Sequence, residues 1–199
     1  MVISELWGAY LIAVLAVMIV PGPSHLLMVS NSLAFGSFRA MATAAGDLSA
    51  NTIQIILAGL SFSFIVVSYP LSFEILRWLG ISYLLYLGFS KVIFSKSLRI
   101  KPAQSNHGNL WFQGFFTSLT NPKAVLFFAA LFPQFISPDY DLFPQLFLLG
   151  VSYIMIDGIF LGFYGFLGGR IQTNEFLKAK LPVISGLGLI SVAVFLMVK

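Results

Sequence analysis

The sequence predicts an all-α integral membrane protein with six transmembrane helices. Of its 199 residues, 58% are hydrophobic and 9% are charged, and the mean hydropathy is +0.93. Soluble domains carry roughly 25% charged residues, so this chain has too few charges for a surface that faces water on all sides. A helix that crosses a bilayer needs about 20 mainly apolar residues, and several stretches meet this length. The predicted spans are Leu6–Phe35, Ala40–Val67, Leu71–Phe94, Leu110–Ile136, Pro144–Gly168 and Leu181–Val198.

Two prolines interrupt the first predicted span. Pro21 and Pro23 have no N–H group, so the carbonyls of Val17 and Ile19 lose their helical partners. Gly22 lies between the prolines, and a residue that precedes a proline is pushed away from helical angles. We therefore expect the first helix to stop and restart within this stretch.

The predicted connections are short, with one exception. The polar stretch Ser95–Asn109 resembles a linker and divides the chain near its middle. We expect a single transmembrane domain, residues 1–199, built from a first three-helix half (1–94), this linker (95–109) and a second three-helix half (110–199). The other connections are the turns Gly36–Arg39, Ser68–Pro70 and Ser137–Leu142 and the stretch Gly169–Lys180.

The positions of lysine and arginine predict the orientation, because cytoplasmic loops of membrane proteins are enriched in these residues. If the linker is cytoplasmic, the inner loops hold eight of the eleven basic residues and both termini lie outside. The net charge of +4 suits an anionic membrane surface better than a nucleic acid. The eight residues are Arg39, Lys91, Lys96, Arg99, Lys101, Arg170, Lys178 and Lys180.

Two halves of three spans each suggest an inverted repeat. Because three is odd, the second half enters the membrane from the side opposite to the first, as in many secondary transporters. The first span of each half carries a proline break, Pro21-Gly22-Pro23 in one and Asn121-Pro122-Lys123 in the other. The second span of each half carries one acid, Asp47 and Asp157. These acids lie about seven and about thirteen residues into their spans, so the match between the halves is incomplete.

Few charged residues lie inside the predicted spans and away from their ends. They are Asp47, Lys123 and Asp157, with His25 as a further titratable side chain. Placing an aspartate or lysine at the centre of a membrane helix costs roughly 2.5–3.5 kcal/mol on insertion scales, and such residues usually mark an ion or substrate path. They are the first candidates for a functional site.

Asp47 belongs to a polar stripe. Thr43, Asp47, Asn51 and Gln54 follow each other at i, i+4, i+8 and i+11, which places them on one helix face. Such amides also serve as polar contacts between spans. A contact needs only one or two of them, however, and this stripe includes an acid, which favours a function in binding or transport.

Asp157 shares its helix face with Tyr153 and Tyr164. An acid this deep in a span suits an ammonium ligand or a protonatable carrier. Gly158 and Gly162 in the same helix have the small-xxx-small spacing that is typical of helix packing.

Pro122 frees the carbonyl of Ser118 at the second break, and Lys123 places a cation beside it. One interpretation is a proline kink that neighbouring hydroxyl groups repair. In the other, Lys123 neutralises one of the acids or binds a substrate carboxylate, and the sequence does not choose between these. The role of His25 is also left open by the sequence: the side chain could relay protons or could serve only in packing.

Four segments in order carry a family resemblance. They are Pro21-Gly22-Pro23, the run GDLSAN-x-x-Q from Gly46 to Gln54, WLGISYLLYLGF from Trp78 to Phe89, and GFFTSLTNPKAVLFFAALFPQF from Gly114 to Phe135. Together they resemble the LysE/RhtB family of amino-acid exporters along nearly the whole chain. The resemblance implies a six-span protein of the bacterial inner membrane that exports amino acids or related metabolites by proton exchange. Many members follow the first motif with Asn or Asp, whereas this chain has Ser24-His25, which leaves the substrate preference open.

A zwitterionic substrate needs one site for a carboxylate and one for an ammonium group. Freed N–H groups after Pro23 and Pro122, at positive helix ends, suit the carboxylate. Asp47 or Asp157 suits the ammonium, and the other acid is expected to carry the proton. The expected partners are an amino acid, protons and the lipid bilayer, without nucleic acid, metal or cofactor, and a homodimer is left open. The predicted binding or coupling residues are Pro21, Gly22, Pro23, Asp47, Asn51, Gln54, Asn121, Pro122, Lys123 and Asp157.

Two other functions compete with this prediction. One is an exporter of a metal or organic cation, although a metal site would need more acidic, histidine or cysteine ligands than this interior supplies. The other is an intramembrane enzyme in which Asp47 and Asp157 form an acid–base pair. No HExxH or GxSxG motif accompanies that pair, and the chain has no cysteine, which excludes disulfides and thiolate metal sites.

Overall fold

The computed structural model describes residues 3–19, 21–68, 70–93, 109–137, 140–173 and 175–198, and every regular element in these ranges is helical. Two elements are short and irregular, a π-helical turn (η1) and a 3₁₀ turn (η2). The elements are α1 (Ile3–Ile19), α2 (Pro23–Phe35), α3 (Ser37–Ser68), α4 (Pro70–Ile93), α5 (Leu110–Leu119), α6 (Pro122–Leu126), η1 (Phe127–Leu131), η2 (Phe132–Phe135), α7 (Leu142–Thr173) and α8 (Glu175–Val198).

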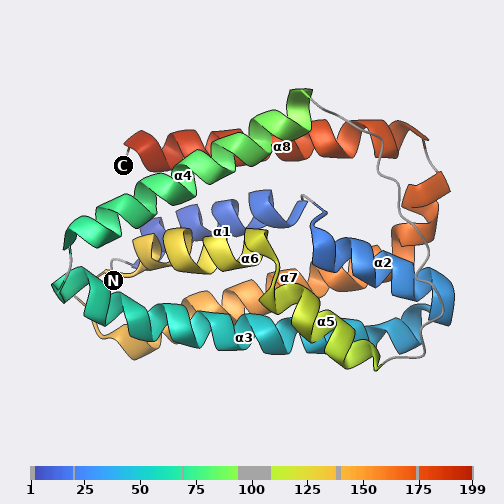
Figure 1. The fold of residues 1–199 in the computed structure, drawn as a ribbon, viewed down its shortest axis with the longest axis horizontal. Coiled ribbons are helices and arrows are strands. Elements are labelled where there is room, and N and C mark those ends of the chain that lie inside the picture. The colour runs from blue at the N-terminus through green and yellow to red at the C-terminus, as the bar shows by residue number, and fades with distance from the viewer. Residues whose placement is uncertain are drawn as a thin grey trace.

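The helices lie lengthwise in one bundle (Figure 1). α4 packs along α8, α3 packs along α7, and α1 and α6 occupy the middle of the view between these pairs. The start of α1 and the end of α8 lie at the same end of the bundle, which we call the terminal half. The opposite half contains α2 and α5.

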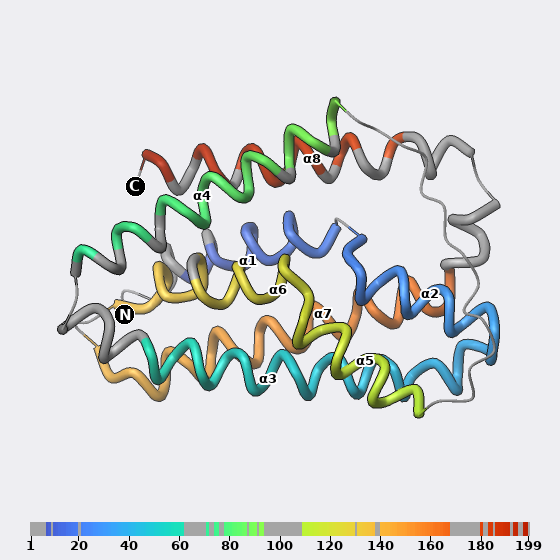
Figure 2. The backbone as a smooth tube through the Cα atoms, in the orientation of Figure 1, coloured from blue at the N-terminus to red at the C-terminus, as the bar shows by residue number. Residues whose placement is uncertain are grey.

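Both predicted proline breaks are present. α1 and α2 are bent by 49°, and α5 and the helical stretch Pro122–Phe135 are bent by 47°, so that the chain changes direction near the middle of the bundle (Figure 2). Pro23 and Pro122 each occupy the first position of the new helix, where a missing N–H costs nothing. The Asn121 side chain caps α6 by accepting a hydrogen bond from the Lys123 N–H at 3.1 Å.

The connections are shorter than predicted at two of the turns. The predicted turn Gly36–Arg39 is wrong, because α3 already begins at Ser37 and Gly36 alone, at φ +85°, reverses the chain. Glycine reaches this left-handed angle without the steric cost that a side chain adds. The predicted turn Ser68–Pro70 is also too long, because α4 begins at Pro70, whose fixed φ suits a first helical position.

The predicted connection Gly169–Lys180 is wrong for a different reason. α7 continues to Thr173 and α8 begins at Glu175, so helix occupies most of this polar stretch. Polar residues are compatible with a helix that extends beyond the hydrocarbon, since the helix satisfies its own backbone hydrogen bonds. Most of the predicted linker Ser95–Asn109 lies outside the described residues; Asn109 caps α5 by accepting a hydrogen bond from the Trp111 N–H at 3.0 Å.

The polarity of the bundle is that of a membrane protein. Large apolar side chains of α7 such as Phe147, Ile159 and Phe166 point outward and are exposed, whereas Asp47 and Asp157 are 2% exposed. Within the described residues, Leu142–Leu167 is long and apolar enough to span a bilayer by itself, and each bent pair qualifies if it counts as one span.

Glycines bring α3 and α5 into backbone contact. A Cβ atom placed on Gly46 would lie 1.9 Å from the Trp111 carbonyl oxygen, and one placed on Gly114 would lie 2.0 Å from the Thr43 carbonyl oxygen. Only a residue without a side chain permits this approach, which is a common device between membrane helices. It holds α5 directly against the polar stripe of α3.

Aromatic rings fill the terminal half of the bundle. The Tyr10 ring packs 5.2 Å from Phe135, the Phe128 ring packs 4.7 Å from Tyr153, and the Tyr10 hydroxyl donates to the Leu149 carbonyl at 2.9 Å. We call this group the aromatic layer, and its members are all buried. They are Tyr10, Phe127, Phe128, Phe132, Phe135 and Tyr153.

Candidate functional site

The polar stripe of α3 faces the interior of the bundle at the level of the two breaks. Thr43, Asp47, Asn51 and Gln54 are all buried, whereas large apolar side chains on other faces of α3 are exposed, among them Ile53, Ile56 and Leu57. A helix with this pattern presents its polar face to neighbouring helices instead of lipid.

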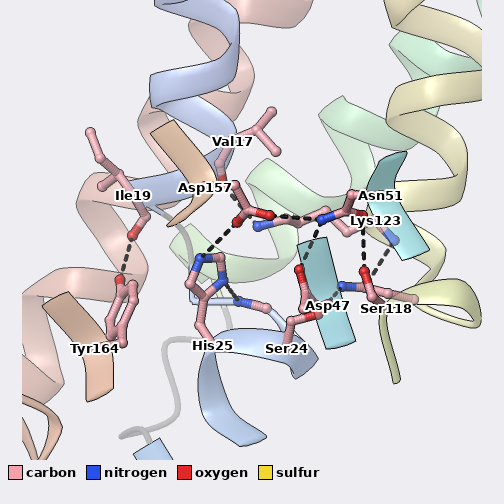
Figure 3. Close-up of polar contacts among 12 residues, drawn as sticks. Val17, Ile19, Ser24, His25, Asp47, Asn51, Ser118, Lys123, Asp157 and Tyr164 are labelled. Carbon is pink, nitrogen blue, oxygen red and sulfur yellow. Dashed lines mark hydrogen bonds and ion pairs between the residues drawn. The ribbon is translucent and has the colours of Figure 1, made fainter. Parts of the chain in front are cut away.

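Asn51 connects the two buried acids (Figure 3). Its Nδ2 atom donates to Asp47 Oδ2 at 2.8 Å and to Asp157 Oδ2 at 2.7 Å, and its Oδ1 atom accepts from the Ser118 hydroxyl at 2.9 Å. Asp47 and Asp157 lie at different depths in their helices. Asn51 reaches both of them because it lies one helical turn beyond Asp47. The structure therefore brings together α3, α5 and α7 at one polar centre.

Lys123 joins the two helix breaks. Its Nζ atom donates to the Val17 carbonyl at 2.8 Å, which is the carbonyl that Pro21 deprives of a helical partner (Figure 3). The side chain is only 9% exposed, and its charge acts on both Asp47 and Asp157. The two sequence motifs at the breaks are thus parts of one contact.

The absence of a side chain at Gly22, and not its backbone angles, favours this contact. Its φ of −92° and ψ of −177° are open to any residue. A Cβ atom at this position, however, would lie 3.3 Å from Lys123 Nζ and 3.5 Å from Lys123 Cε. Gly22 therefore makes room for the lysine between the two prolines.

The other carbonyls freed by these prolines also find partners on distant helices. The Tyr164 hydroxyl of α7 donates to the Ile19 carbonyl at 3.2 Å. Gln54 Nε2 of α3 donates to the Ser118 carbonyl at 3.2 Å. Each break is therefore held by side chains from outside its own span, because an unpaired carbonyl is costly in a membrane.

His25 lies between the first break and the acids. Its Nδ1 atom accepts a long hydrogen bond from the Gly22 N–H at 3.5 Å, and its Nε2 atom lies 3.7 Å from Asp157 Oδ1. The ring packs edge-on against Tyr164, with centroids 4.9 Å apart, and is 3% exposed. Nε2 has no hydrogen-bond partner among the described residues.

A second polar group lies in the half of the bundle that contains α2 and α5. Asn31 is 0% exposed, and its Nδ2 atom donates to the Thr43 hydroxyl at 2.9 Å and to Gln113 Oε1 at 3.2 Å. These three residues form what we call the polar layer, which connects α2 with α3 and α5. The aromatic layer and the polar layer therefore lie on opposite sides of the breaks.

Most of the predicted site residues meet at this centre. Asp47, Asn51, Lys123 and Asp157 are in direct or electrostatic contact, and Gln54 reaches the second break. Asn121 caps α6 and donates to the Ser24 hydroxyl at 3.3 Å. Pro21, Gly22, Pro23 and Pro122 act through the backbone, by freeing carbonyls and making room.

Sequence reasoning missed Ser24, Asn31 and Gln113. Ser24 and Asn31 are small polar residues inside an apolar helix, and Gln113 lies one residue before the closely packed Gly114. An amide side chain inside a predicted membrane span is the sequence signal that could have identified Asn31.

Comparison with known proteins agrees with this arrangement. The family model described as LysE type translocator matches residues 15–199. A homoserine/homoserine lactone efflux protein of Salmonella typhimurium is 34% identical over 171 residues, which is 85% of this chain and 83% of the relative, and one from Salmonella typhi matches to the same extent. An uncharacterized membrane protein of Vibrio cholerae is 29% identical over 179 residues, 88% of this chain and 85% of that protein.

No solved structure matches the chain. The sequence matches point to a transporter and not to an enzyme, and they support the export of an amino acid or another small molecule. Since the family model covers most of the sequence, the chain belongs to the LysE type translocator family.

Proposed function

We propose that the protein exports amino acids or closely related metabolites from the cytoplasm in exchange for protons. The observation that carries this proposal is the bridge from Asn51 to two buried carboxyls, Asp47 and Asp157, between two broken helices. Intramembrane acids of this kind usually serve an ion or substrate path, and broken helices near the midplane are typical of secondary transporter sites.

The proposed topology is six spans in the bacterial inner membrane, arranged as two inverted three-helix halves in one transmembrane domain. The halves are residues 1–94 and 110–199, joined by a cytoplasmic linker at 95–109, with both termini outside. Two observations support it: the first span of each half is bent by a similar angle, and α1 starts at the end of the bundle where α8 finishes. The terminal half would then face outward and the polar layer would face the cytoplasm.

The charge of the site supports exchange. If both acids are ionised and His25 is neutral, Lys123 balances only one of the two negative charges. A buried charge without a partner is costly, so the site favours one further positive charge. A substrate ammonium or a proton would each supply it, and the two would compete. Alternate occupancy by these two cations is the basis of the proposed antiport.

The names of the relatives narrow the chemistry of the substrate. Homoserine has a free carboxylate, whereas in its lactone the carboxylate is closed into a ring, so the group common to both is the α-ammonium. A site that accepts both would depend mainly on its contact with that ammonium, for which Asp47 and Asp157 are suited. N–H groups at the start of α2, after Pro23, are candidates for a carboxylate, whereas the Lys123 N–H at the start of α6 already donates to Asn121.

The test is transport by purified protein in proteoliposomes, with a panel of labelled amino acids, homoserine lactone and an organic cation, each with and without a proton gradient. Asp47→Asn and Asp157→Asn should each abolish gradient-driven amino-acid movement, because each removes a charge that the site needs, while the protein still folds. Asp141→Asn, at an exposed acid, is the matched control and should transport like the wild type. Unchanged transport by both interior variants would refute the site, and movement of the organic cation alone would refute the substrate.

A further inference from the structure

The two acids of the site differ in what lies next to the Oδ1 atom of each carboxyl group. In Asp157, Oδ2 accepts a hydrogen bond from Asn51 at 2.7 Å, and Oδ1 lies 3.7 Å from His25 Nε2, within ion-pair distance but too far for a hydrogen bond. Asp47 Oδ2 accepts from Asn51, whereas Asp47 Oδ1 accepts no hydrogen bond from the described residues although it is buried. Asp47 is therefore the acid with an acceptor available to a substrate ammonium, and Asp157 is the acid paired with a titratable side chain.

The geometry points to His25 as the residue that takes up the exchanged proton and couples it to the break between α1 and α2. This inference rests on the proposed function and identifies the proton site within it. His25 Nδ1 faces the break and His25 Nε2 faces Asp157, so the ring touches both the hinge of the first span and one of the acids.

The hydrogen bonds of the neutral ring indicate where the second proton goes. Because Nδ1 accepts from the Gly22 N–H, the proton of the neutral ring belongs on Nε2, directed at Asp157. Uptake of a further proton must then occur at Nδ1. Both contacts are long, at 3.5 and 3.7 Å, so neither holds the ring tightly in place.

A proton on Nδ1 changes both contacts in the same direction. It converts Nδ1 from an acceptor into a donor, so that two N–H groups face each other and the contact with Gly22 is lost. At the same time the ring becomes a cation and is drawn toward the Asp157 carboxylate. Both effects move the ring away from the break. Gly22 also packs against Lys123, so a shift at Gly22 reaches the Lys123 contact with the Val17 carbonyl.

The charged and titratable groups around His25 explain why a proton and a substrate would bind in turn and not together. Asp157 of α7 favours the protonated ring, Lys123 of α6 opposes it, and Asp47 of α3 lies across the Asn51 bridge. Tyr164 of α7 contributes a neutral ring edge. A substrate ammonium at Asp47 would add a second cation beside the imidazolium, so a protonated His25 and a bound substrate exclude each other.

The experiment separates proton coupling from substrate binding. In proteoliposomes, His25→Gln should retain the exchange of labelled for unlabelled homoserine at equal pH on both sides, because Asp47 is intact. Accumulation of homoserine driven by a pH gradient should fall to the level of protein-free vesicles, because glutamine takes up no proton. His107→Gln, at the other histidine of the chain, is the control and should retain both activities.

A folded His25→Gln variant that still accumulates homoserine, or that loses exchange as well, would overturn the assignment to His25. A wild type that moves no amino acid at all would instead refute the proposed function. A second measurement needs no change at His25: in the His107→Gln protein it is the single histidine, and ¹⁵N NMR of its ring reports both nitrogens. We expect the form with the proton on Nε2, uptake at Nδ1 on acidification, and displacement of that proton by homoserine. A ring that takes up no second proton in the pH range of transport would also overturn the inference.

Discussion

The aromatic layer and the polar layer close the two sides of the same pair of breaks by different means. In the aromatic layer, rings such as Phe128 and Phe132 pack edge to face and are almost completely buried. In the polar layer, Asn31 holds α2 to α3 and α5 by two hydrogen bonds. Separating the rings would expose a large apolar area to water, whereas the amide and hydroxyl groups can exchange their hydrogen bonds for water or for a polar substrate.

This difference indicates which side opens more easily. The net contribution of a hydrogen bond is small when water can replace the partner, typically about 1 kcal/mol. Burial of a large apolar side chain contributes about 1.5–3 kcal/mol for each residue. We therefore expect the polar layer to yield first, which in the proposed orientation gives access from the cytoplasm, as an exporter requires.

The largest effect is expected where α3 and α5 are in backbone contact beside the polar layer. Gly114→Leu would place atoms where the Thr43 carbonyl oxygen now lies, so the two helices must separate and the variant should fail to form a stable, monodisperse protein in detergent. Gly162→Leu is the matched control, because a Cβ atom at Gly162 meets nothing within 4 Å. Equal thermal stability of the two variants would show that the α3–α5 contact is not essential.

The second-largest effect is expected from removing one side chain from the aromatic layer, compared with removing one from the polar layer. Phe132→Ala leaves a cavity in the aromatic layer and should reduce the free energy of unfolding by about 3–5 kcal/mol. Asn31→Ala removes two interhelical hydrogen bonds and should cost only about 1 kcal/mol, because bonds of this kind contribute little between membrane helices. Thermal unfolding in the same detergent measures both. If Asn31→Ala is the more damaging variant, the ranking of the two layers is wrong.

The smallest effect on stability is expected at Gly22, which lies at the first break between the two layers. The effect on transport should be larger there. Gly22→Ala brings a methyl group within 3.3 Å of Lys123 Nζ, so the end of the lysine must shift by a few tenths of an ångström, which disturbs its hydrogen bond to the Val17 carbonyl. We expect slower homoserine exchange in proteoliposomes with an unfolding temperature close to that of the wild type. Gly8→Ala in α1, where nothing lies within 4 Å, is the control. Wild-type exchange by Gly22→Ala would remove the link between the two breaks from the mechanism.

Local rules of the chain were sufficient to predict the positions of the breaks and of the buried polar face. Proline lacks a donor wherever it stands, so Pro21, Pro23 and Pro122 identify the interrupted helices before any neighbour is known. The stripe that includes Asp47 and Asn51 follows from helical periodicity alone. The same local rules failed at Gly169–Lys180, because polarity alone does not distinguish a loop from a helix end beyond the hydrocarbon.

Tertiary structure decided which partners these residues have. Lys123 and Val17 are 106 residues apart, as are Asn51 and Asp157, and neither pairing follows from spacing within a helix. The amino-acid sequence alone predicts that three carbonyls lose their helical donors and that two acids lie inside the bundle. Only the packing of the helices decided that Lys123, Tyr164 and Gln54 would occupy those carbonyls, that Asn51 would join the acids, and that His25 would face Asp157. The reason is physical: the loss of a donor depends on one residue, whereas its replacement depends on which helix lies within hydrogen-bonding distance.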